Sequence, residues 1–89
     1  MQDLIQIRAV VEDNYNIKDI TIHSRQRDYT DARKVYSYIA RRCTRYTSNQ
    51  IGKIINRTHA SILICHNRAN ELMETDENFR MSIRYCMHL

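Results

Sequence analysis

The sequence predicts a small all-α fold, and three observations support this class. The chain has no proline and one glycine, Gly52, whereas hairpins and β-sandwiches need frequent Gly, Asn-Gly or Pro turns. Apolar residues recur at three- and four-residue intervals in several segments, which is typical of helices. With 89 residues, of which 43% are apolar, the chain has room for one core. We therefore expect residues 1–89 to form a single domain.

The first helix is expected over residues 3–14. Leu4, Ile7 and Val11 fall at positions i, i+3 and i+7 there, so they share one helical face. Residues 17–28 lack such a stripe, and we expect a connector with at most one turn of helix.

The second helix is expected over residues 29–44. Its predicted apolar stripe consists of Ala32, Val35, Tyr36, Ile39 and Cys43. A basic ridge is predicted on the opposite face, at four-residue steps, by Arg33, Ser37, Arg41 and Arg45. This ridge is suited to a phosphate backbone, although Arg41, Arg42 and Arg45 also complement the dipole at a helix C-terminus.

A short helix and a long helix follow, joined by a tight turn. Thr47 and Gln50 have the spacing of a capping box, which predicts a helix over residues 48–55. Asn56 suits the left-handed turn after it, and the long helix is expected over residues 58–74. Its predicted apolar positions are Ile62, Leu63, His66, Ala69 and Met73. Together the two helices predict a helix-turn-helix motif.

The last helix is expected over residues 76–87, with Thr75 or Asp76 as its cap. The side chains predicted to pack inward from it are Phe79, Ile83 and Cys86. This completes a chain of helices with short links.

Positive charge is concentrated in the middle of the chain. Residues 25–57 hold nine Lys and Arg against two Asp, a net +7, whereas residues 1–24 carry −2 and residues 58–89 carry −1. Arginine outnumbers lysine 11 to 3, which favours planar, bidentate contacts to phosphates or bases. Such a segment in a small helical domain indicates nucleic-acid binding, with a solvated charged face as the alternative.

The start of the long helix is the candidate reading surface. In helix-turn-helix proteins the N-terminal residues of the second helix meet base edges in the major groove. Here they are Arg57, Thr58, His59, Ala60 and Ser61, and none is a bulky apolar residue. The alternative is an ordinary helical hairpin whose first turn is solvated. The free N–H groups near Ser48, Asn49 and Gln50 also suit a phosphate, with plain capping by Thr47 as the alternative.

Four blocks of sequence resemble the C-terminal duplex-binding domain of the bacterial replication initiator DnaA. The blocks are Ser24–Arg27, Ala32–Val35, Gln50–Gly52 and Asn56–Leu63. The family shows a Ser-Arg pair, then Ala-Arg-Gln, then Ile-Gly, then Gly-Arg-Asp-His-Thr-Thr-Val. The resemblance covers roughly residues 9–80, and at fold level the chain also resembles the Trp repressor. The resemblance to the DnaA domain implies a helix-turn-helix that reads double-stranded DNA in replication initiation or its regulation.

The resemblance also implies a role for each matching residue. Arg25 would enter the minor groove, and Arg27 would support it or contact phosphate. Arg33 and Lys34 would hold the DNA backbone. Phosphate contacts would come from Ser48, Asn49 and Arg57, and base contacts from His59, Ala60 and Ser61. The expected DNA-binding residues are Arg25, Arg27, Arg33, Lys34, Thr47, Ser48, Asn49, Arg57, Thr58, His59, Ala60 and Ser61.

This sequence departs from the family pattern at three positions of the Asn56–Leu63 block. Thr58 replaces an Asp that would accept from a cytosine amino group, Ala60 replaces the first Thr, and Asn56 stands where the family has a Gly-Gly turn. The fold and DNA binding therefore carry over better than the target sequence does. The 89 residues also hold no Gly-x-x-x-x-Gly-Lys-Ser/Thr motif for a nucleotide.

Other classes of function find little support. No base, nucleophile and orienting group are brought together by spacing, so no enzyme is expected. The cysteines and histidines include no Cys-x-x-Cys pair, so we expect no metal site. We also expect no cofactor. Three widely spaced cysteines and the absence of a long apolar run predict a cytoplasmic protein that does not enter a membrane.

Three alternatives stay open. One is a transcriptional regulator of the Trp repressor type. Another is a protein–protein adaptor, or a homodimer, that uses the two terminal helices. RNA binding is the third, although it usually requires exposed aromatic side chains on a sheet or loop.

Overall fold

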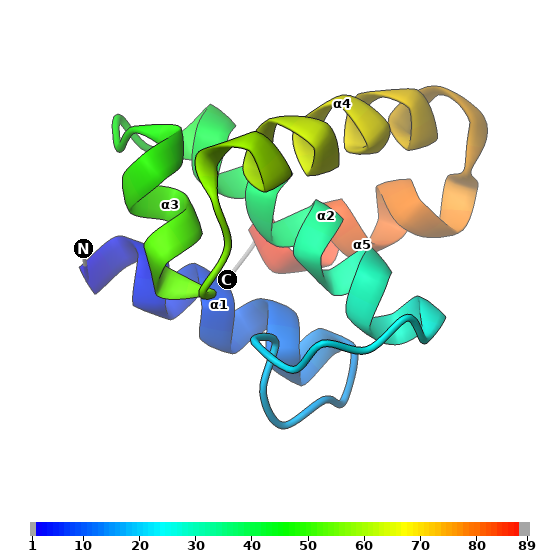
Figure 1. Ribbon diagram of the computed structural model, residues 1–89. Coiled ribbons are helices and arrows are strands. Elements are labelled where there is room, and N and C mark those ends of the chain that lie inside the picture. The colour runs from blue at the N-terminus through cyan, green and yellow to red at the C-terminus, as the bar shows by residue number, and fades with distance from the viewer. Residues whose placement is uncertain (1, 88–89) are drawn as a thin grey trace.

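The computed structural model describes residues 2–87, and it confirms the all-α fold class (Figure 1). Within this range it has five helices: α1 Gln2–Asn14, α2 Arg27–Cys43, α3 Ser48–Ile54, α4 His59–Thr75 and α5 Glu77–Met87. Each lies within one or two residues of its expected bounds. None of these helices is long and apolar enough to cross a membrane.

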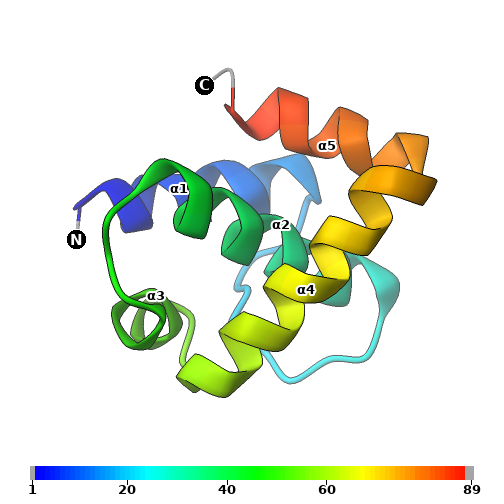
Figure 2. The same ribbon diagram turned by 90° about the horizontal axis from the view of Figure 1, so that it is seen from above.

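Helix α2 is the centre of the fold and packs against each of the other four helices. Seven of its residues are buried, and they are Ala32, Val35, Tyr36, Ser37, Tyr38, Ile39 and Ala40. Figure 2 shows α3 and the start of α4 at one edge of the molecule and α5 at the other. The helix-turn-helix is therefore carried on one side of α2, with α1 and α5 supporting it from the rest of the molecule.

The expected inward faces of the helices are largely confirmed. Leu4 and Val11 are buried, and Phe79, Ile83 and Cys86 of α5 are buried as predicted. The left-handed backbone expected at Asn56 is present, with φ of 56°. At the start of α5 the Asp76 carboxylate accepts the Phe79 N–H at 3.2 Å, so Asp76 is the cap.

Four expected positions differ from the structure. Cys43 is exposed because α2 ends there and the chain turns away from the core. Leu63 is 40% exposed, since Ile62 next to it takes the inward position on α4. The basic ridge of α2 is interrupted, because Ser37 is buried and donates to the Arg33 carbonyl oxygen. Arg45 lies beyond the end of the helix.

Candidate nucleic-acid interface

Each helix of the helix-turn-helix begins after a threonine whose side chain caps it. Thr47 accepts the Gln50 N–H at 3.2 Å, and the Gln50 side chain accepts the Thr47 N–H at 2.9 Å, which confirms the predicted capping box. Thr58 accepts the Ser61 N–H at 3.2 Å and so begins α4. These caps fix where each helix starts, and they supply partners for amides that would otherwise be unpaired.

Gly52 allows the turn between α3 and α4 to pass close over α3. The Arg57 N–H donates to the Gly52 carbonyl oxygen at 2.8 Å, after the left-handed residue Asn56. A Cβ atom added at Gly52 would collide with the backbone carbonyl of Arg57 and would press on Ile62 of α4. The position therefore needs glycine for close packing of the two helices, which accounts for the Ile-Gly block in the sequence.

The first turn of α4 leaves His59 and Ala60 exposed. The two neighbouring hydroxyls are partly engaged, because Thr58 donates to the Ser61 hydroxyl at 3.2 Å while it caps the helix. Of the residues expected to contact bases, His59 and Ala60 are thus the two whose side chains are exposed and not engaged at the helix end. Thr58 and Ser61 contribute first to the geometry of the helix end.

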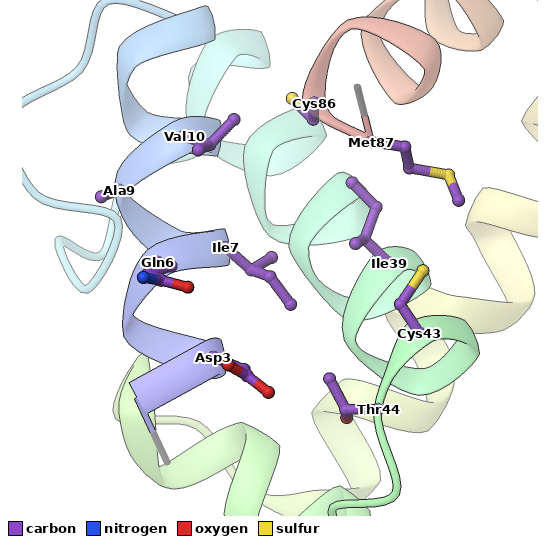
Figure 3. Close-up of a pocket in the computed structure, with 10 residues that line it drawn as sticks. All are labelled: Asp3, Gln6, Ile7, Ala9, Val10, Ile39, Cys43, Thr44, Cys86 and Met87. Atoms are coloured by element: carbon purple, nitrogen blue, oxygen red, sulfur yellow. The ribbon is translucent and has the colours of Figure 1, made fainter. Parts of the chain in front are cut away.

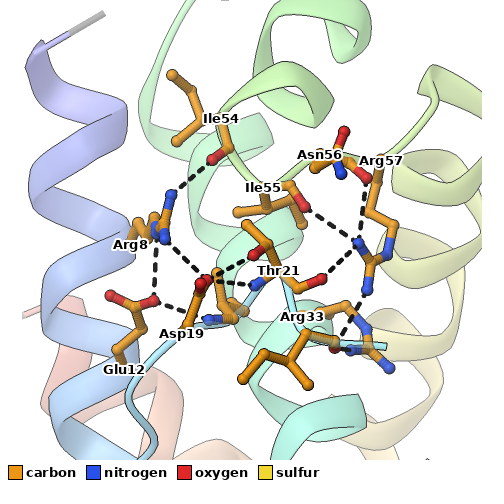
Figure 4. Close-up of polar contacts among 11 residues, drawn as sticks. Arg8, Glu12, Asp19, Thr21, Arg33, Ile54, Ile55, Asn56 and Arg57 are labelled. Carbon is orange, nitrogen blue, oxygen red and sulfur yellow. Dashed lines mark hydrogen bonds and ion pairs between the residues drawn. The ribbon is translucent and has the colours of Figure 1, made fainter. Parts of the chain in front are cut away.

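Arg57 and Arg33 hold the loop that precedes α2 (Figure 4). The Arg57 guanidinium donates to the carbonyl oxygens of Thr21 at 3.2 Å and Ile22 at 3.4 Å. That of Arg33 donates to Ile22 at 3.2 Å and Ser24 at 2.9 Å. Partial burial and the neighbouring Arg57 charge lower the pKa of Arg33. Both arginines thus donate to loop carbonyls, and the phosphate contacts that the family resemblance implies for them stay a prediction.

Arg8 of α1 ties the same loop to the end of α3. Its guanidinium contacts Asp19 at 3.0 Å, Glu12 at 3.2 Å and the Ile54 carbonyl oxygen at 2.9 Å (Figure 4). Glu12 also accepts the Ile20 N–H at 2.8 Å. Sequence reasoning missed this residue. The four-residue spacing of Arg8 and Glu12 signalled a helical ion pair, but its bond to α3 depends on the fold.

Arg25 and Arg27 differ in how free they are. Arg25 is exposed in the loop and makes no hydrogen bond or ion pair within residues 2–87. Arg27 contacts Asp31 at 3.4 Å and Asp76 at 3.6 Å, and Lys34 contacts Asp31 at 3.7 Å. The Arg27 side chain is 79% exposed, so its ion pairs are weak and exchangeable.

The start of α3 lies beside the end of α2. Asn49 is exposed, and the half-buried Ser48 accepts a hydrogen bond from Arg41 at 2.8 Å. Arg42 of the same α2 turn lies over the Tyr38 ring at 4.7 Å. Arg41 therefore lies beside the residues expected to face phosphate, Thr47, Ser48 and Asn49. Arg41 itself is not among the expected DNA-binding residues.

One hollow of the described chain is lined by α1, α2 and α5. It has a volume of about 560 Å³ between α1, the end of α2 and α5 (Figure 3). Ile7 and Val10 line it from α1, opposite Ile39 and the Cys43 thiol of α2. Among residues 2–87 no three His, Cys, Asp or Glu side chains are placed to hold a metal ion.

Comparison with known proteins gives one consistent family. A family profile described as "Bacterial dnaA protein helix-turn-helix" matches residues 4–68. Three similar proteins are chromosomal replication initiator proteins DnaA. That of Aliarcobacter butzleri is 35% identical over 83 residues, which are 90% of this chain and 19% of that protein.

The other two relatives are similar at the same level. The Borreliella burgdorferi B31 protein is 33% identical over 72 residues, 80% of this chain and 15% of that protein. The Bacteroides thetaiotaomicron protein is 30% identical over 81 residues, 88% of this chain and 17% of that protein. The chain thus spans less than a fifth of the length of these three relatives.

Proposed function

The chain belongs to the family of bacterial DnaA helix-turn-helix domains, and from this premise we propose that it binds double-stranded DNA with sequence preference. Residues 1–89 act as one non-catalytic DNA-binding domain in this proposal. Helix α4 lies in the major groove, and the basic loop at residues 24–27 lies near the minor groove. The relatives' name, chromosomal replication initiator protein, supports a role in replication initiation or its regulation.

One observation carries this proposal. Arg57 stands two residues before α4, next to its N-cap Thr58, and donates to the carbonyls of Thr21 and Ile22. The loop that carries the free Arg25 is therefore held against the start of α4. A helix that enters one groove and an arm that enters the adjacent groove need such a fixed spacing. An ordinary helical hairpin has no need to hold an exposed arginine loop beside its first turn.

The proposed contacts divide into positioning and reading. Arg27, Lys34, Thr47, Ser48 and Asn49 contact phosphates, and they fix register without reading sequence. His59, Ala60, Ser61 and Thr58 face base edges, and Arg25 enters the minor groove. Arg33 and Arg57 keep the loop in place, and their remaining N–H groups face the DNA backbone.

A titration of duplex DNA against salt tests the proposal. A fluorescently labelled pool of random 20-base-pair duplexes is titrated with the protein between 50 and 300 mM salt. Affinity should fall steeply with salt, because each neutralised phosphate releases counterions. Selection from the same pool should then enrich one motif. Arg84→Ala, which removes an exposed arginine from α5, is the matched control and should leave both results unchanged.

Three outcomes would contradict the proposal. Binding without a salt slope excludes phosphate contacts. Equal affinity for all duplexes excludes sequence preference. A stable protein partner recovered in the absence of duplex binding favours the adaptor alternative.

A further inference from the structure

The outward ridge of α4 begins with apolar side chains. Ala60, Ile64, Asn67 and Glu71 are all exposed, and they follow one another at i, i+4, i+7 and i+11. This spacing places them on a single face of the helix. Ile62 and Ala69 point to the opposite side and are buried against the rest of the protein.

Ile64 is the large apolar residue at the centre of this ridge. It is 59% exposed, whereas Ile62 two positions earlier is 1% exposed. Ile64 shares a groove of about 170 Å³ with Arg33 and Arg57, the two arginines that hold the basic loop. An isoleucine that does not serve the core therefore stands beside the cations of the proposed DNA-binding surface.

We propose that Ile64 determines sequence preference by contacting the 5-methyl group of a thymine in the major groove. This inference rests on the proposed function. Among base edges in the major groove, the thymine methyl is the apolar group, and apolar side chains are its usual contacts. A polar base edge opposite Ile64 would lose water without gaining a hydrogen bond. Ile64 therefore favours a T·A pair over the alternatives at its position.

The spacing along the ridge extends this assignment. Ala60 and Ile64 are separated by four residues, about 6 Å along the helix axis. This is close to two base steps of about 3.4 Å each. The ridge thus carries a small apolar group, a large apolar group and then the Asn67 amide, which suits adenine.

Acidic residues limit how far along α4 the contact extends. Glu71 continues the outward ridge, and Glu74 is exposed one turn later. Both carboxylates would repel phosphates, so the second half of the helix faces away from the DNA. Ile64 lies before these charges and within the half that carries His59 and Ala60.

Deoxyuridine tests the inference, because it removes the methyl group and leaves the hydrogen-bonding edge of thymine in place. Two random duplex pools are prepared, one with thymidine and one with deoxyuridine, and a duplex selected by the native protein is resynthesised with each thymidine replaced in turn. The proteins compared are the native chain, Ile64→Ala and Met81→Ala. Met81 is 58% exposed on α5, so its variant removes a similar apolar surface elsewhere.

The expected result is a coupling between one methyl group and one side chain. Deoxyuridine at one position should weaken binding by the native protein and by Met81→Ala about fourfold, the effect of exposing one methyl group. The same replacement should not weaken binding by Ile64→Ala. Circular dichroism should show that all three proteins fold alike, since Ile64 is outside the core.

Several results would overturn the inference. They are equal binding of both pools, a deoxyuridine effect of the same size in Ile64→Ala, and unchanged selection by that variant. If duplex binding and its salt slope persist in these cases, the proposed function stands and the role of Ile64 alone is wrong. If the native protein binds neither pool, the proposed function fails as well.

Discussion

The guanidinium of Arg57 and the carbonyl oxygen of Thr21 are joined across 36 positions of sequence by a hydrogen bond of 3.2 Å. The bond connects Arg57, two residues before α4, to the loop that carries Arg25. Neither its donor nor its acceptor is part of a helix. The relative position of the loop and α4 therefore depends on side-chain to backbone bonds.

Replacing Arg57 with alanine should loosen the loop without unfolding the protein. Hydrogen exchange of the amides at residues 21–24 should become faster, and duplex affinity should fall about three- to tenfold, because hydrogen bonds from a charged donor are lost. Arg45→Ala removes one exposed positive charge from the same basic segment and serves as the control. Equal exchange and equal affinity in the two variants would show that Arg57 contributes charge alone.

Gly52→Ala should destabilise the protein by about 2 kcal/mol. Alanine is the better helix former by about 1 kcal/mol, but its Cβ would meet the backbone carbonyl of Arg57, which cannot swing aside. Urea unfolding measures the difference. Lys53→Ala, at the next and exposed position of α3, should change the free energy of unfolding by less than about 0.5 kcal/mol. A stable Gly52→Ala protein would mean that the turn can move.

Tyr36→Phe should cost about 1–2 kcal/mol of unfolding free energy. The buried Tyr36 hydroxyl donates to the Ile51 carbonyl oxygen at 2.8 Å, and the Ile55 N–H turns to Gly52 instead. Without the hydroxyl, a buried carbonyl loses its partner. Tyr85→Phe removes a hydroxyl from a tyrosine that is 49% exposed, and thermal unfolding should show little effect. Similar losses in the two variants would argue against the buried bond.

Stability should decrease as pH falls through the range in which His66 takes up a proton. Burial, together with the charges of Arg41 and Arg42, lowers the pKa of His66 below its ordinary value of 6.5. The unfolded chain then binds more protons than the folded chain near and below pH 6.5, so the free energy of unfolding decreases there as the pH is lowered. His66→Gln should have a flatter dependence between pH 7.5 and 5.5. A parallel curve would contradict this role.

Lys34→Ala and His59→Ala should weaken DNA binding in different ways. Loss of Lys34 should lower affinity for all duplexes alike and reduce the salt slope by about one. Loss of His59 should instead flatten the preference between the selected duplex and a scrambled one. Competition titrations with both duplexes separate the two results. A uniform loss in both variants would count against base reading by His59.

The sequence predicted the helices and their caps well because these are local features. The Thr47 and Gln50 capping box, the left-handed Asn56 and the inward Phe79 all depend on residues a few positions apart. The errors arise where the orientation of a helix decides which face is covered. Leu63 and Ile62 fit an apolar stripe almost equally, and only the packing of α4 shows that Ile62 is the inward one.

The candidate site follows the same division. The DNA-binding residues are a prediction of the sequence, and their exposure agrees with this prediction for Arg25, His59 and Ala60. The bonds of Arg8 and Arg57 to distant carbonyls could not be derived from residue spacing, because they join segments that meet only in the folded chain. Sequence reasoning also did not single out Ile64, the residue of our further proposal, because it assigns an isoleucine to the core.

The arginine bonds to the loop carbonyls have a thermodynamic consequence. They order residues 21–24 when the protein folds, so the conformational entropy of this loop is lost before any DNA arrives. Association with DNA then needs no folding step in the loop that we propose to enter the minor groove. The heat-capacity change of binding should correspond to the contact surface alone, without the larger decrease that accompanies coupled folding.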